Sequence, residues 1–346
     1  MLPRKRVLNA LEFKPTDKPA LDAQISGVGL YEHGEKIREL FRSIGSDFNT
    51  ISEEPVPVPP PGAKDADGNY LEYRTDEWGV QTVYRIFGIQ GHPSKRPLDD
   101  WANLKDYTLP PLAPARQDKA AFEWICRDMA EQTKTYFRRG GWVSIFERLE
   151  SLRRFEDILM DLYDDSPELH QIADLITKRC MTEVANHIDY GFDAVQFGDD
   201  FGTQENMMIS PEIFRSFFKP RYAELMKPIK AAGKKVLFHS CGYVKPILED
   251  LKEIGVDGIW PQLNVYGDLK EFAATCRSIG LAVAIHPERS NLLTRGTPDE
   301  VRRQMYAYAD AFRPTEGGSW FYLEIDNGFP YKNIEAMVEV IKELRK

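Results

Sequence analysis

The second half of the chain alternates between short apolar runs and longer amphipathic segments. The apolar runs are rich in β-branched and aromatic residues, which is typical of buried strands. They lie at residues 194–197, 235–239, 258–262, 281–286 and 320–324. Helices are predicted between and after them, at residues 244–254, 269–279 and 333–344, with two more that begin at Ser210-Pro211-Glu212 and at the capping box Thr297–Glu300. Repeated strand–helix units predict a parallel sheet with helices outside it.

The first half adds three candidate strands. They lie at residues 19–25, 47–51 and 142–146. Eight strand–helix units favour an α/β fold of the (β/α)8 TIM-barrel type, preceded by an N-terminal extension. A doubly wound open sheet is the alternative. The chain has no Gly-x-Gly-x-x-Gly turn after a strand, which counts against a dinucleotide-binding form of that sheet.

Residues 52–110 interrupt this alternation. The proline-rich run at 54–62 excludes a helix or a central strand. Asp67-Gly68 is typical of a hairpin turn, and residues 70–73 and 81–84 predict short antiparallel strands. We therefore expect a single barrel domain over residues 1–346 with a small β insertion at 52–110, able to cover one mouth of the barrel.

Composition narrows the class of protein. The formal net charge of −9 disfavours nucleic acid as a partner, because an acidic surface repels phosphates. The basic N-terminus lacks an apolar segment behind it, and no stretch is long and apolar enough to predict a membrane span. The four cysteines are not spaced as a disulfide framework. A cytoplasmic protein without a membrane partner is expected, and a homodimer stays open.

The clearest chemical motif is His239-Ser-Cys241-Gly242 at the end of a predicted strand. Residues i and i+2 of a strand point to the same face, and the carboxyl ends of barrel strands carry catalytic groups. Imidazole and thiolate together suit Zn²⁺. The alternative interpretation is a hydrogen-bonded buried pair with no metal.

A second motif, Asp199-Asp200, also follows an apolar strand and leads to Gln204. Adjacent carboxylates at a strand end are costly unless a cation, a proton or a metal meets them. We interpret Asp199 and Asp200 as catalytic acid–base groups and Gln204 as a substrate contact. The alternative is that the two aspartates cap loop amides.

Further polar residues stand at the ends of the other predicted strands. Glu324 and Asp326 share one face and offer oxygen ligands to a metal held by His239 and Cys241, although a simple turn at Asp326 is equally compatible. Arg289 is suited to an anion. The residues we predict to contact substrate are Gln204, Arg148, Trp260, Gln262, Arg289 and Asp326.

Four motifs in this order resemble a known superfamily. They are Gly198-Asp-Asp-Phe-Gly-Thr-Gln204, Ile209-Ser-Pro-Glu-Ile-Phe214, Lys219-Pro-Arg-Tyr222 and His239-Ser-Cys-Gly242. Together they resemble the uroporphyrinogen decarboxylase superfamily, and more closely its corrinoid-dependent methyltransferase and O-demethylase branch. The resemblance implies a (β/α)8 barrel in which the His-x-Cys pair binds zinc.

The chain departs from the superfamily at two places. The methyltransferases usually complete the zinc site with a cysteine near the last strand, where this chain has Glu324 and Asp326. A His239, Cys241 and Glu324 site is of the kind expected in demethylating relatives. The decarboxylases carry an Arg-Gln-x-Gly-Arg segment near the N-terminus, whereas residues 19–45 of this chain contain only Arg38 and Arg42, outside that pattern.

The resemblance therefore implies a zinc-dependent methyltransferase. It would move a methyl group from a small methoxylated or methylated donor to a separate corrinoid protein, because no corrinoid domain is recognisable in the chain. Two alternatives stay open. One is a metal-free lyase that decarboxylates a carboxylated substrate with Asp199 or Asp200 as the acid. The other is a non-catalytic relative that binds a ligand.

Overall fold

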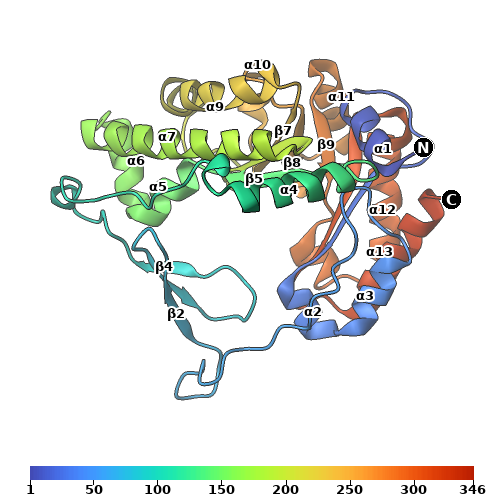
Figure 1. The fold of residues 1–346 in the computed structure, drawn as a ribbon. Helices are drawn as coiled ribbons and strands as arrows, with labels where there is room; N and C mark the ends of the chain where they lie inside the picture. Colours follow the sequence, from blue (N-terminus) through green and yellow to red (C-terminus); the bar gives the residue numbers. More distant parts are fainter.

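The core of the molecule is a sheet of seven parallel strands curled into a barrel-like form, with helices around it (Figure 1). The structure is a computed structural model that describes residues 1–346. The strand order is β1-β10-β9-β8-β7-β6-β5: strands β5 to β10 lie side by side in chain order, and β1 pairs with β10. The strands are β1 (Leu21–Ile25), β5 (Arg139–Val143), β6 (Ala194–Gly198), β7 (Lys235–Ser240), β8 (Gly258–Pro261), β9 (Ala282–Ile285) and β10 (Ser319–Ile325). The predicted α/β TIM-barrel-like fold is confirmed.

The helices follow the predicted order. Those before β6 are α1 (Pro3–Leu11), α2 (Gly27–His33), α3 (Glu35–Arg42), α4 (Lys119–Gln132), α5 (Phe146–Leu152), α6 (Phe155–Tyr163) and α7 (Pro167–Tyr190). The later ones are α8 (Pro211–Ile213), α9 (Lys219–Ala231), α10 (Leu248–Glu253), α11 (Leu269–Ile279), α12 (Pro298–Phe312) and α13 (Tyr331–Leu344). Ser210 caps α8, and both hydrogen bonds of the predicted capping box form at α12. None of the helices is long and apolar enough to cross a membrane.

The strand predicted at residues 47–51 does not form. Only Asp47 makes ladder-like bonds there: its N–H donates to the Leu21 carbonyl at 2.7 Å, and its own carbonyl accepts from Phe137 at 3.0 Å. The buried Asp47 carboxylate binds Arg6 and Arg345, which come from the two ends of the chain. These ion pairs fix the segment as an irregular bridge between β1 and β5, the two edges of the sheet.

The strand predicted at residues 142–146 starts and ends earlier, at Arg139 and Val143. The reason lies in the carboxylate of Asp199, which accepts backbone N–H groups from Ile145, Phe146 and Glu147. Three N–H groups that converge on one acceptor are typical of the first turn of a helix. Phe146 accordingly begins α5.

The insertion forms a three-stranded antiparallel sheet below the barrel (Figure 1). Its strands are β2 (Glu72–Thr75), β3 (Gln81–Tyr84) and β4 (His92–Lys95), of which the sequence predicted the first two. The predicted turn at Asp67-Gly68 is present, with Gly68 at a φ of 84° and an isolated bridge between Lys64 and Tyr70 around it.

Candidate metal and substrate site

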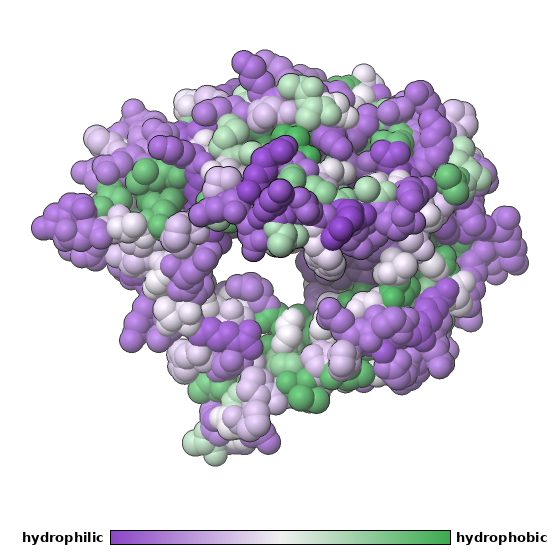
Figure 2. All heavy atoms as spheres, in the orientation of Figure 1, coloured by the Kyte–Doolittle hydropathy of each residue, from purple (hydrophilic) through white to green (hydrophobic).

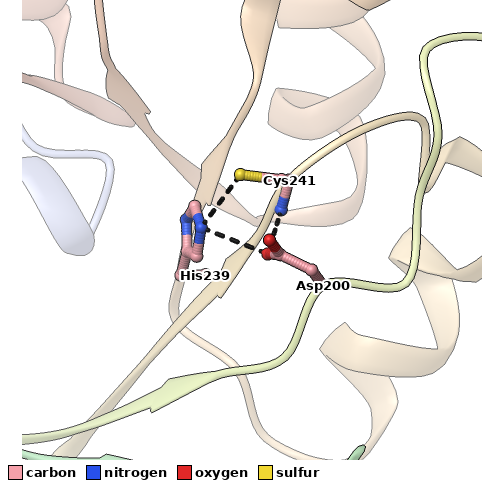
Figure 3. Close-up of side chains that lie close together, drawn as sticks. All are labelled: Asp200, His239 and Cys241. Carbon is pink, nitrogen blue, oxygen red and sulfur yellow. Dashed lines mark hydrogen bonds and ion pairs between the residues drawn. The ribbon is translucent and has the colours of Figure 1, made fainter. Parts of the chain in front are cut away.

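Three potential metal ligands meet at the carboxyl ends of β6 and β7 (Figure 3). His239 lies in β7, Cys241 is the first residue after that strand, and Asp200 follows β6. The Nε2 atom of His239 is 3.3 Å from the Sγ atom of Cys241 and 3.3 Å from a carboxylate oxygen of Asp200. All three ligand atoms lie within 4.8 Å of one another.

Two glycines allow this approach. A Cβ atom on Gly242 would lie 2.1 Å from the carbonyl of Gly202, so the loops after β6 and β7 pass at backbone contact. Gly242 also has a φ of 72°, which disfavours any other residue. The Cys241 N–H donates to Asp200 at 2.7 Å, which ties the two loops together. The glycines of both sequence motifs thus serve to bring Asp200 to the His–Cys pair.

The imidazole of His239 is oriented by the backbone of Trp260. Its Nδ1 atom lies 2.9 Å from the Trp260 carbonyl, which can only accept a hydrogen bond. Nδ1 therefore carries the proton, and Nε2 presents its lone pair towards Cys241 and Asp200. A histidine that donates its second N–H to a carbonyl is the usual arrangement of a metal ligand.

The charges of this cluster fit a cation. Burial, together with the Asp200 carboxylate, raises the pKa of the Cys241 thiol to about 12. Although burial opposes it, the hydrogen bond from the Cys241 N–H helps to keep the pKa of Asp200 below its ordinary value. The Asp200 carboxylate, the imidazole of His239 and the Cys241 thiol, which needs a nearby positive charge to ionise, form a donor set that suits Zn²⁺.

Two indole rings flank His239. The ring centroid of Trp260 lies 4.1 Å from that of His239, and the centroid of Trp142 lies 5.5 Å away on β5. Trp142 reaches this position because Gly198 has no side chain: a Cβ atom there would lie 2.2 Å from the indole. Both indole rings therefore pack close to the imidazole of His239.

A cavity of about 250 Å³ opens beside the cluster. His239 and Cys241 line it, together with four residues predicted to contact substrate: Gln204, Trp260, Gln262 and Arg289. The side-chain amides of Gln204 and Gln262 bond to each other at 3.2–3.3 Å.

The last two predicted substrate contacts are placed differently. Asp326 forms an ion pair with the guanidinium of Arg289 at 3.2 Å. It therefore contacts a residue that lines the cavity and does not line the cavity itself. Arg148 lies in a separate, larger cavity.

That second cavity, of about 710 Å³, lies between the insertion and helices α5 and α7. The space-filling view shows an opening between the insertion and the barrel (Figure 2). Arg148 lies over the Trp78 ring, 4.2 Å from its centroid, and pairs with Asp76 of the insertion. Glu147 and Glu150 also line this cavity, and burial, with the nearby Asp199 and Asp200, raises the pKa of both to about 8.

Asp199, predicted as a catalytic residue, is fully buried and lines neither cavity. Besides three N–H groups of α5, its carboxylate accepts the hydroxyl of Tyr222. Burial raises its pKa to about 6. These contacts hold the end of β6 against the start of α5, which is the loop-capping alternative that the sequence left open.

Replacing Asp199 by asparagine is expected to lower the free energy of unfolding by about 3 kcal/mol, because an amide leaves buried N–H groups without acceptors. Urea denaturation measures this change. Tyr222→Phe removes one bond only and should cost about 1 kcal/mol. A stable Asp199→Asn protein without catalytic activity would instead support a chemical role for Asp199.

Glu324, predicted as the third metal ligand, is not part of the cluster of ligand atoms. It lies near the end of β10, and burial raises the pKa of its carboxyl group. The carboxylate that contacts the His–Cys pair is Asp200. Metal binding by Glu324 stays a prediction.

Three residues at the site were not among those predicted from the sequence. They are Trp142, Glu147 and His286. His286 directly follows β9, and His239 lies near the end of β7, so both histidines stand at strand ends and the alternation of strands and helices was a usable signal for His286. The position of Trp142 depends on the missing side chain of Gly198, a contact between neighbouring strands that no local pattern reveals.

The fold and the strand-end site define a barrel protein with a polar pocket at the carboxyl ends of its strands. The chain belongs to the uroporphyrinogen decarboxylase (URO-D) family, whose sequence model matches residues 140–344, more than half of the chain. No curated protein matches it.

Solved structures resemble the chain in fold. A methyltransferase from Methanosarcina mazei superposes with a TM-score of 0.63 at 18% identity and covers 99% of both chains. A B12-independent methionine synthase from Shewanella sp. W3-18-1 has a TM-score of 0.46 at 11% identity, covering 95% of this chain and 93% of its own.

Proposed function

We propose that the chain is a cytoplasmic, zinc-dependent methyltransferase that passes a methyl group from a small methoxylated or methylated donor to a separate corrinoid protein. The observation that carries the proposal is the cluster of His239, Cys241 and Asp200 at adjoining strand ends. Family membership and the fold shared with a methyltransferase support it.

In this proposal His239 and Cys241 hold the metal, with Asp200 as the carboxylate nearest to them. When bound, zinc supplies a Lewis acid for the heteroatom that carries the methyl group. Glu324 is kept as a further candidate ligand, which replacement of each carboxylate can test.

The other residues of the site bind and orient. The Trp260 carbonyl holds the proton of His239 at Nδ1, which keeps Nε2 free for a metal. Gln204, Gln262 and Arg289 line the adjoining cavity and would contact the donor. Trp142 and Trp260 pack their indole rings close to the imidazole of His239 and support its position.

Two measurements on the purified protein test the proposal together. Elemental analysis should find about one zinc per chain, as expected for a three-ligand catalytic site. Incubation with cob(I)alamin and a panel of methoxylated and methylated compounds should produce methylcobalamin, followed by its absorbance. Absence of zinc, together with decarboxylation of a carboxylated substrate that survives chelators, would instead favour the metal-free lyase.

A further inference from the structure

The cavity beside the ligand cluster contains a second imidazole, that of His286. Its Nδ1 atom lies 2.9 Å from the indole nitrogen of Trp260. An indole N–H can only donate, so Nδ1 of His286 must be the unprotonated acceptor. The ring is therefore neutral, and its proton resides on Nε2.

Trp260 thus fixes the position of the ring proton in two histidines, at Nδ1 in one and at Nε2 in the other. Its carbonyl accepts from Nδ1 of His239, which leaves a lone pair on Nε2 of that ring. Its indole donates to Nδ1 of His286, which leaves an N–H on Nε2. One imidazole is prepared as a ligand and the other as a hydrogen-bond donor.

The donor on His286 has no partner within the protein. The residue is 8% exposed, and its Nε2 atom is buried without a hydrogen bond. Leaving a buried N–H unpaired costs about 1–3 kcal/mol. Such a cost is commonly tolerated at a site where a ligand completes the bond.

The charge of the neighbouring wall favours an anionic acceptor. Arg289 lines the same cavity and is 42% exposed in its side chain. Glu288 also lines it, but its carboxylate accepts three backbone N–H groups, from Ser290, Asn291 and Leu292. Asp326 takes up only part of the Arg289 guanidinium, through Nη1. The wall beside His286 therefore offers the unpaired Nε2 donor and the guanidinium N–H groups of Arg289 that Asp326 does not take up.

We propose that His286 and Arg289 together bind a carboxylate group of the methyl donor, with Nε2 of His286 as a neutral donor. The inference rests on the proposed function and narrows its substrate to methylated compounds that carry a carboxylate. His286 then determines specificity, while the ligand cluster beside the same cavity is left for the methyl-bearing end.

Acetate is a suitable probe, with acetamide as its neutral counterpart of similar size. In zinc-loaded protein labelled with ¹⁵N-histidine, NMR should show one neutral imidazole protonated at Nε2, absent from a His286→Asn variant. Its resonance should shift on addition of acetate and much less with acetamide.

Two substitutions distinguish the contributions of the two ring nitrogens of His286. His286→Gln keeps a donor near Nε2, and His286→Asn keeps an acceptor near Nδ1 for Trp260 but offers no donor at Nε2. Loss of one hydrogen bond to a charged group should weaken acetate binding roughly tenfold in the Asn variant. The Gln variant should bind within about threefold of wild type, and zinc content should stay equal in all three proteins.

Equal affinity of the three proteins for acetate would overturn the inference, since acetate held by the metal alone does not depend on His286. A proton on Nδ1 of His286 would overturn it too. Failure of the proposed function has a different signature: acetate binding that depends on His286, in a protein that transfers no methyl group. Methyl transfer from neutral donors as fast as from carboxylated ones would contradict the inference alone.

Discussion

Replacing Cys241 by alanine is expected to lower the affinity for zinc at least about 100-fold and to abolish methyl transfer, because the change removes the only sulfur ligand of the cluster. Competition with a chromogenic chelator measures the affinity, and formation of methylcobalamin measures the activity. The remaining imidazole and carboxylate form an incomplete site.

Cys126→Ala is a matched control for the Cys241 variant. Cys126 is a half-buried free thiol on α4, and its Sγ atom faces the carbonyl of Asp189, remote in sequence from the cluster. That variant should keep both zinc and activity. If the Cys241→Ala protein bound zinc as tightly as the Cys126→Ala control, the metal site would be refuted, whatever activity the Cys241 variant retains.

The same assay identifies the carboxylate ligand. Asp200→Asn should weaken zinc binding more than Glu324→Gln, because Asp200 already contacts the imidazole and the Cys241 amide. Both substitutions remove one charge without a large change of size. The reverse order would return Glu324 to the role that the sequence motifs and the family resemblance suggested.

The sequence was sufficient for most of the parallel sheet because each strand is a short apolar run followed by a helix with its own start signal. The capping box at Thr297 and the serine cap at Ser210 are local devices, so they were predictable. The pairing of His239 with Cys241 also followed from the alternation along one strand.

The third member of the cluster could not be identified in this way. Asp200 follows β6, and Glu324 lies near the end of β10. Of these two strands, β6 is the direct neighbour of β7 in the sheet, and β10 is not. Adjacency of strands, together with the contact of Gly202 and Gly242, decides which carboxylate arrives. Local sequence patterns alone rank the two carboxylates equally, since this contact forms only when β6 and β7 pair in the sheet.

The closure of the barrel itself was also beyond the sequence pattern. The segment at residues 47–51 was a candidate for the eighth strand, yet the ion pairs of Asp47 hold it in an irregular form. The sheet consequently ends at β1 on one side and β5 on the other. Side chains inside the barrel must then connect these edges.

A buried ion pair makes this connection. Arg139 of β5 binds Asp22 of β1 at 2.8 Å, and their side chains are 17% and 1% exposed. Arg139 also donates to the Gln196 amide oxygen at 2.6 Å. Charged groups inside a barrel lose hydration, so each depends on its partner.

Replacing Arg139 by methionine is therefore expected to lower the free energy of unfolding by about 3–5 kcal/mol, because the Asp22 carboxylate stays buried without its cation. Urea denaturation measures the loss. Lys270→Met is the matched control, since the Lys270–Asp310 pair is on the surface with both side chains 69% exposed, and little change is expected there.

A double variant distinguishes charge from packing. Asp22→Leu combined with Arg139→Met removes both charges and keeps apolar volume between β1 and β5, so it should be more stable than Arg139→Met alone. If the double variant were less stable than the single one, the cost would lie in lost packing and in the bond to Gln196. Recovery would show that the destabilisation comes from the uncompensated Asp22 carboxylate between the two edges of the sheet.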